Sequence, residues 1–103
     1  MIEYSKKTYD AVRAGDIRRL GVQLGAACID AQIPVQIVAK WVGASRQGVY
    51  NWFTGVNDVA PRHQQKVTRI TEVLLRGLDD KKLPAIDLST SLDIIAQYRK
   101  DTK

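Results

Sequence analysis

The chain has 103 residues, carries 16 Lys and Arg against 11 Asp and Glu, and has a formal net charge of +5. This length suffices for one domain with its own core, and the single cysteine, Cys28, excludes an intramolecular disulfide and a cysteine metal cluster. No apolar run has the character of a signal peptide or the length of a membrane span, so we expect no membrane association and a cytoplasmic location.

The positive charge is concentrated in the middle of the chain. Residues 1–16 hold three basic and three acidic side chains, residues 71–103 hold six of each, and residues 17–70 hold seven basic against two acidic ones. The middle segment therefore carries the whole excess. This asymmetry favours a polyanionic partner, because Lys and Arg that neutralise phosphates release condensed counterions. A solvated basic face without a partner is the alternative.

The first half of the chain begins with a segment over residues 1–15 that is typical of an arm or a short capping element. Asp16 is expected to cap a first helix over residues 17–31, because apolar residues recur there at helical spacing. Cys28 lies on the apolar face of that helix and is expected to be buried. Pro34 closes the connection that follows and suits the start of the next helix.

Residues 35–55 predict two short helices joined by a tight turn. Ala39 allows the two helices to cross closely, since a larger side chain would separate their axes, and Gly43 supplies the positive φ that the turn needs. Ser45 can cap the second helix, and Gly55 ends it. The apolar contacts between the helices are expected from residues at helical spacing, namely Val38, Val42, Val49, Trp52 and Phe53.

The second half of the chain predicts two further helices. After a loop over residues 56–60, Pro61 opens a helix with an apolar side of Val67, Ile70, Val73 and Leu74. A polar connection over residues 77–84 precedes a last helix over about 89–100, with a stripe of Leu88, Leu92, Ile95 and Tyr98. That stripe can equally pack on the core or contact a second copy of the chain.

The motif over residues 35–55 resembles the helix-turn-helix of lambda-type phage repressors and Cro proteins, the XRE-type family. The matching residues are Val38, Ala39, Gly43, Val49, Trp52 and Gly55, each at the family's spacing. Where the family often has Gln at the first residue of the motif, this chain has Val35. The resemblance implies an all-α fold, a compact four- to five-helix DNA-binding domain with an additional C-terminal helix. The expected organisation is an arm over 1–15, this domain over 16–77, and a connection with the last helix over 78–103.

The family's function would be sequence-specific binding of double-stranded DNA by a phage or bacterial transcriptional regulator. Its second motif helix would enter the major groove, where Arg46 can donate two bonds to guanine and Gln47 can pair with adenine. The candidate base-reading residues are Ser45, Arg46, Gln47, Tyr50 and Asn51. The candidate phosphate contacts, from helix starts and the loop after the motif, are Gln36, Lys40, Thr54, Asn57, Arg62 and Lys66. One short helix contacts little DNA, so we expect a homodimer on a pseudo-palindromic site.

An enzyme is not expected from this sequence. His63 is the only histidine, it has no nucleophile near it in the sequence, and no glycine loop for phosphates is present. We accordingly expect no metal and no cofactor. Two other functions fit the sequence. One is a protein-binding module with a helix-turn-helix fold. It would bind a polymerase, a toxin or another host protein through Trp41, Tyr50 and the surroundings of Trp52. The other is a nonspecific architectural DNA binder.

Overall fold

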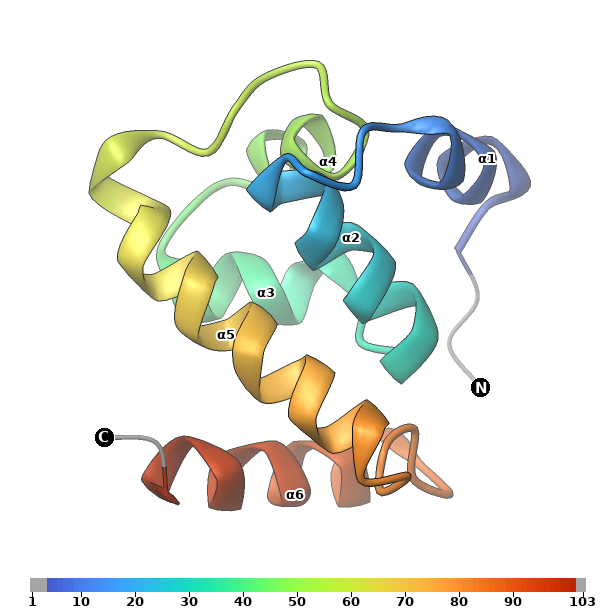
Figure 1. Cartoon of the computed structure of the whole chain (residues 1–103), viewed down its shortest axis with the longest axis vertical. Helices are drawn as coiled ribbons and strands as arrows, with labels where there is room; N and C mark the ends of the chain where they lie inside the picture. The colour runs from blue at the N-terminus through green and yellow to red at the C-terminus, as the bar shows by residue number, and fades with distance from the viewer. Residues whose placement is uncertain (1–3, 102–103) are drawn as a thin grey trace.

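The computed structural model describes residues 4–101 of the chain, so residues 1–3 of the predicted arm and residues 102–103 lie outside the described residues. The described part contains six helices and no strand, which confirms the all-α class (Figure 1). None of these helices is long and apolar enough to cross a membrane. The helices are α1 (Lys6–Ala14), α2 (Leu20–Ala31), α3 (Val35–Val42), α4 (Arg46–Phe53), α5 (Pro61–Asp79) and α6 (Leu88–Asp101).

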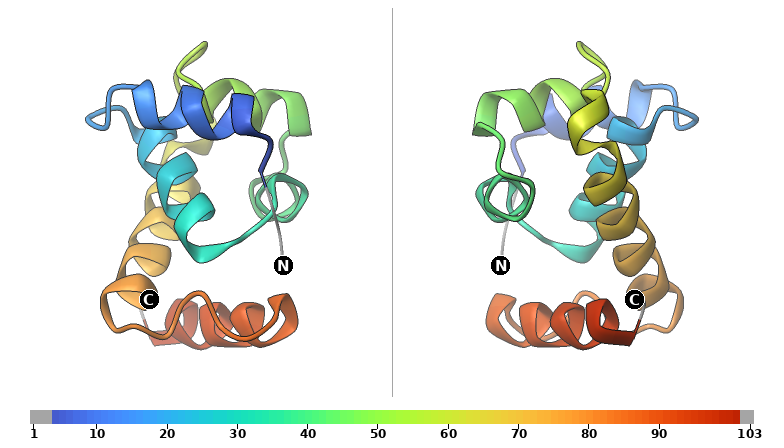
Figure 2. Two further views of the ribbon diagram at one scale, coloured as in Figure 1. Left: turned by 90° about the vertical axis from the view of Figure 1, so that its right-hand side faces the viewer. Right: turned by 90° about the vertical axis from the view of Figure 1, so that its left-hand side faces the viewer.

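Helix α2 is the central element, and it contacts α1, α4 and α5. Helices α1 and α4 lie at one end of the molecule and α6 lies at the other, with α3 between them (Figure 1, Figure 2). The radius of gyration is 12.5 Å, close to the value of about 13 Å expected for one folded domain of this length.

The core is formed by the inner faces of α2 to α5. Its fully buried side chains include Leu24, Cys28, Val38, Val49, Phe53, Val67 and Leu74. Val12 of α1 and Ile95 of α6 belong to the same cluster, and each is 2% exposed. The segment before residue 16 is therefore not a loose arm over its described length. It contains a helix that packs on the domain, in line with the capping element that the sequence left open.

Helix α2 begins at Leu20, later than the sequence predicts, and Asp16 does not cap it. The Asp16 carboxylate instead accepts the backbone N–H of Arg18 at 2.9 Å, and Arg19 occupies the N-cap position, where its side chain makes no capping hydrogen bond. A short acidic side chain readily forms such a local turn in place of a cap. Ile17 is 58% exposed, so its apolar character was a misleading sign of helix.

The turn between α3 and α4 has the local geometry that the sequence predicts. Gly43 has a φ of 74°, and its N–H donates to the carbonyl of Ala39 at 2.9 Å. The Ser45 Oγ accepts the N–H of Gly48 at 3.0 Å and so caps α4. Gly55 follows the end of α4 with a φ of 78°. Both predicted glycine positions and the predicted cap are confirmed.

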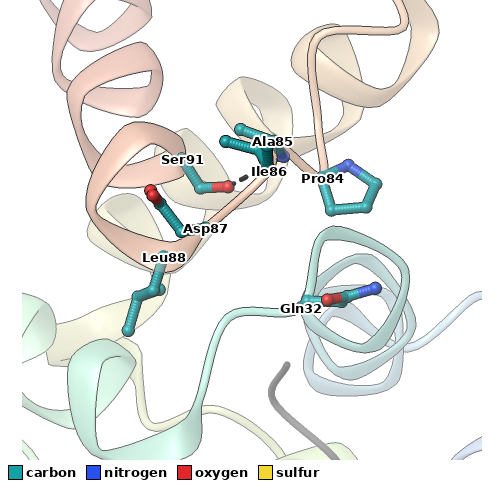
Figure 3. Close-up of a pocket in the computed structure, with 7 residues that line it drawn as sticks. All are labelled: Gln32, Pro84, Ala85, Ile86, Asp87, Leu88 and Ser91. Atoms are coloured by element: carbon teal, nitrogen blue, oxygen red, sulfur yellow. Dashed lines mark hydrogen bonds between the residues drawn. The ribbon is translucent and has the colours of Figure 1, made fainter.

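Helix α5 begins at Pro61 as predicted, but it continues to Asp79, past the predicted connection at Gly77. Gly77 is a helical residue on which the returning loop packs, since a Cβ there would lie 2.5 Å from Cδ1 of Leu83. A glycine that permits close approach was thus misread as a helix end. The loop then leads into α6, where Figure 3 shows the Ser91 Oγ accepting the Ala85 N–H at 3.0 Å.

The apolar stripe of α6 packs against the rest of the molecule. Ile95 is buried, and Leu88 and Tyr98 are partly buried against the core. Of the two uses of this stripe that the sequence left open, core packing accounts for these three side chains. Leu92, the fourth, is partly buried and lines the groove between α3 and α6.

Candidate nucleic-acid interface

The outer side of α4 lines a groove of about 530 Å³. Gln47, Tyr50, Asn51 and Thr54, all predicted site residues, line this groove from α4. The opposite wall is α1. Ser45 and Arg46 lie at the start of α4 and are exposed. The predicted base-reading residues therefore lie either at the start of α4 or in the groove beside it. One predicted phosphate contact, Thr54, lines the same groove.

The amides of Gln47 and Asn51 are hydrogen-bonded to each other across one turn of α4. The Gln47 Nε2 donates to the Asn51 Oδ1 at 3.0 Å. Each amide carries two donor hydrogens and a carbonyl acceptor, so one such bond leaves donors on both side chains. The pair is therefore ordered in the free chain and still able to bond a base edge or a phosphate.

Thr54 is less available than the sequence suggested. Its hydroxyl donates to the Tyr50 carbonyl at 2.9 Å, one turn earlier in the chain. A hydroxyl has one donor hydrogen. Thr54 can therefore donate to a phosphate only by giving up this bond.

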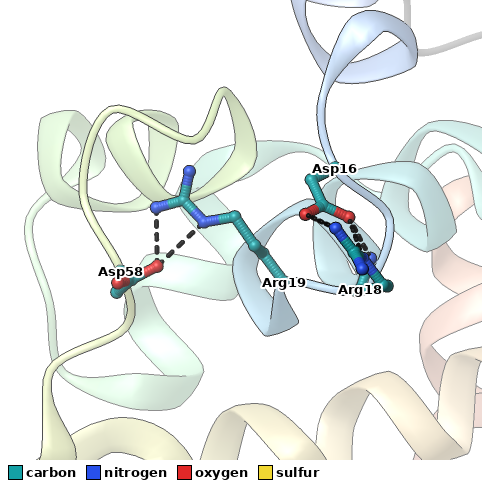
Figure 4. Close-up of polar contacts among 4 residues, drawn as sticks. All are labelled: Asp16, Arg18, Arg19 and Asp58. Carbon is teal, nitrogen blue, oxygen red and sulfur yellow. Dashed lines mark hydrogen bonds and ion pairs between the residues drawn. The ribbon is translucent and has the colours of Figure 1, made fainter.

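The loop after α4 is held against the start of α2 by Arg19 (Figure 4). Its guanidinium donates to the Gly55 carbonyl at 2.7 Å and pairs with Asp58 at 2.6 Å. Nearby, Arg18 pairs with Asp16 at 3.0 Å, and the hydrogen bonds from Arg18 lower the pKa of that carboxyl (Figure 4). Both arginines of this segment are therefore occupied inside the chain.

These internal ion pairs identify which basic side chains remain for a partner. Within the described part of the chain, no carboxylate forms an ion pair with Lys7, Arg46, Arg62, Lys66 or Arg69. Arg62 and Lys66 are exposed on the first half of α5, and Arg62 contacts the ring of His63 at 3.2 Å. Part of the positive charge of residues 17–70 is therefore paired with carboxylates of the same chain.

The remaining predicted phosphate contacts are scattered. Lys40 lines a separate groove of about 190 Å³ between α3 and α6, where the Arg99 guanidinium lies 5.7 Å from the centre of the Trp41 ring. Gln36 is exposed near the start of α3, and Asn57 is exposed in the loop after α4. The structure does not bring Lys40 together with the residues of α4.

The contribution of α1 to this groove was not predicted from the sequence. Lys7, Thr8 and Ala11 line the groove beside α4. A signal was present, because Ser5 is a favourable N-cap and its Oγ accepts the Thr8 N–H at 3.2 Å. Thr8, Ala11 and Val12 also follow the spacing of one helical face.

Among residues 4–101, the side chains that could do covalent chemistry do not lie together. Cys28 is fully buried, and burial raises the pKa of its thiol. The His63 ring packs 5.5 Å from the Trp52 ring. Among the described residues, no three His, Cys, Asp or Glu side chains are placed to hold a metal ion. In comparisons with known proteins, no family model, no curated sequence and no solved structure matches this chain.

Proposed function

We propose that the chain is a sequence-specific DNA-binding transcriptional regulator of the phage repressor and Cro type, which inserts α4 into the major groove. The observation that carries the proposal is the first turn of α4. Ser45 caps it, Arg46 and Gln47 are exposed on it, and Val49 and Phe53 on the inner side are fully buried. A helix held in this way presents polar side chains on a rigid support, and the major groove of B-DNA is wide enough to admit it.

In this proposal α2 to α5 form the lambda-repressor-like domain and α6 is the additional helix. Arg46 would donate to guanine, while the ordered pair of Gln47 and Asn51 would bond adenine or a neighbouring phosphate. Arg62 and Lys66 would neutralise phosphates, which supports affinity without sequence preference. One eight-residue helix reads few base pairs, so we propose a homodimer with half-sites about 34 Å apart.

The test is the selection of bound duplexes from a random DNA pool at about 150 mM salt, where screening over roughly 8 Å suppresses loose electrostatic binding. A recovered pseudo-palindrome supports the proposal. Arg46→Ala and Gln47→Ala should then relax base preference, each by about 1–3 kcal/mol. Lys66→Ala should weaken binding to all sequences alike.

Lys82→Ala is the matched control, because it removes the same charge from an exposed residue of the α5–α6 connection, at the end of the molecule away from α4. It should leave binding unchanged. Absence of enrichment, together with strong salt dependence, would indicate a nonspecific architectural binder. Enrichment that survives Arg46→Ala unaltered would refute α4 as the reading helix.

A protein-binding module is the second candidate, and the groove between α3 and α6 favours it. Trp41 and Ile37 are only partly buried there, and Leu92 lines the same groove from α6. Half-exposed aromatic side chains are common anchors in protein interfaces. Weak DNA binding that does not depend on Arg46, combined with loss of a captured polymerase or toxin partner on Trp41→Ala, would favour this function.

A further inference from the structure

Two helices, rather than one, form the end of the molecule that carries the candidate interface. Helices α1 and α4 lie side by side there (Figure 1, Figure 2), and residues of both line the groove of about 530 Å³. An α-helix with its side chains is about 10–12 Å across, and the major groove is about 12 Å wide. A duplex that receives α4 therefore has no room for α1 in the same groove. Helix α1 would then lie beside the sugar–phosphate strand that borders this groove.

The chemistry of the groove suits that strand. Lys7 contributes an ammonium group from α1, and the lining residues include no carboxylate. Thr8 accepts a hydrogen bond from the Ser5 hydroxyl at 3.0 Å, so its own hydroxyl hydrogen remains available to an acceptor. Asn51 retains amide donors on the opposite wall. Donors on both walls and a single sign of charge fit an anionic chain.

The neighbouring lysine differs in its surroundings. Lys6 pairs with Asp10 at 2.9 Å one helical turn away and is not among the residues that line the groove. Lys7 has no such ion pair within the described part of the chain. Two adjacent lysines of one helix thus occupy distinct environments, and only one of them lines the groove.

Helix α1 is fixed to the domain at both ends. At its start the Tyr4 hydroxyl donates to the Ile33 carbonyl, and the Tyr4 ring lies 6.4 Å from the ring of Phe53 in α4. At its end Val12 is buried and Arg13 pairs with Asp30 of α2. The groove is therefore a preformed feature of the fold.

We propose that the groove between α1 and α4 holds one sugar–phosphate strand of the bound duplex, with Lys7 as a phosphate contact. The proposal rests on the proposed function and deepens it. Helix α1 then contacts the outside of this strand while α4 lies in the major groove, and the two contacts together set the angle at which α4 enters. Contacts of this kind position the protein without reading sequence.

The experiment measures the affinity of Lys7→Ala and Lys6→Ala for the selected duplex and for a scrambled duplex, from 50 to 200 mM salt. Lys7→Ala should weaken both duplexes by the same factor. It should also remove about one unit from the slope of log affinity against log salt. The ratio of the wild-type affinity to the Lys7→Ala affinity should therefore fall about threefold between 50 and 200 mM salt. Lys6→Ala, with the same charge change on the same helix, should leave affinity and slope unchanged.

Ethylation of individual phosphates provides the second measurement. One ethylated phosphate that blocks the wild type should be tolerated by Lys7→Ala. If Lys7→Ala and Lys6→Ala behave alike while Arg46→Ala still relaxes base preference, the groove assignment fails and the proposed function stands. If the wild type enriches no duplex, both fail.

Discussion

Arg19 and Asp58 join the start of α2 to the loop after α4, 39 residues away in the chain. The Arg19 Nη2 lies 2.6 Å from the Asp58 Oδ1, and its Nη1 donates to the Gly55 carbonyl at 2.7 Å. A Cβ on Gly55 would lie 2.9 Å from that same Nη1. The Arg19 guanidinium thus has room only because residue 55 is a glycine, and it holds the end of the α3–α4 unit in place.

Arg19→Ala should cost about 1–2 kcal/mol of unfolding free energy. Most of the loss comes from the partly buried bond to the Gly55 carbonyl, since a net hydrogen bond contributes about 1 kcal/mol. The ion pair contributes less, because the Asp58 side chain is 82% exposed. Asp58→Ala is the matched control and should cost under about 1 kcal/mol. Equal costs in urea denaturation would show that the carbonyl bond is not the main contribution.

Gly21→Ala should destabilise the crossing of α2 and α4. A Cβ on Gly21 would lie 2.5 Å from the Trp52 carbonyl oxygen, and a backbone atom cannot yield without moving α4. Overpacking of this kind costs about 1–3 kcal/mol, and we expect the upper end. Gly43→Asn is the control, because a Cβ there meets nothing within 4 Å and Asn tolerates the left-handed conformation. Thermal unfolding that ranks Gly43→Asn as the worse variant would contradict the close crossing.

The unit over residues 35–55 could be predicted because its signals are local. The positive φ of Gly43, the cap at Ser45 and the positive φ of Gly55 each act within a few residues. The physical constraint and the residue that meets it then lie in the same short window of sequence. Such features depend little on how the rest of the chain packs.

The features that sequence analysis missed depend on distant contacts. Gly21 and Gly77 lie within helices and allow Trp52 and Leu83 to approach closely, which helical periodicity cannot reveal. Helix α1 was predicted as an arm or cap, and its place beside α4 follows from packing. The charge distribution was affected in the same way. The sequence assigned the positive charge of Arg19 to the excess available for a partner, whereas in the structure Arg19 pairs with Asp58.

Cys28 should be inert in the folded chain. It is fully buried, and burial raises the pKa of its thiol, whereas the thiolate is the reactive form. A thiol reagent at pH 8 should modify it only after denaturation. The unfolded thiol ionises near pH 8.5, and the folded thiol stays neutral. The contribution of Cys28 to the unfolding free energy should therefore be constant below about pH 8 and fall as the pH rises beyond it. Rapid modification of the native chain would contradict the burial.

Ser45 separates the stability of α4 from its proposed contact with DNA. Ser45→Ala removes the cap and should cost about 1 kcal/mol. Ser45→Asp keeps an oxygen that can accept the Gly48 N–H, so unfolding free energy should stay near that of the wild type. Its negative charge would nevertheless lie at the first turn of α4, where the polyanionic duplex is proposed to bind, and binding to every duplex should weaken.

Ser89→Asp is the matched control for Ser45→Asp, because it adds the same charge to an exposed residue in the first turn of α6, at the end of the molecule away from α4. It should leave DNA affinity unchanged and alter the unfolding free energy by less than about 1 kcal/mol. Urea denaturation and fluorescence anisotropy with a labelled duplex measure the two quantities separately. If Ser45→Ala is as stable as the wild type, the side-chain cap contributes little. If Ser45→Asp is stable and binds DNA as the wild type does, the first turn of α4 does not approach the phosphates, and α4 is not the reading helix.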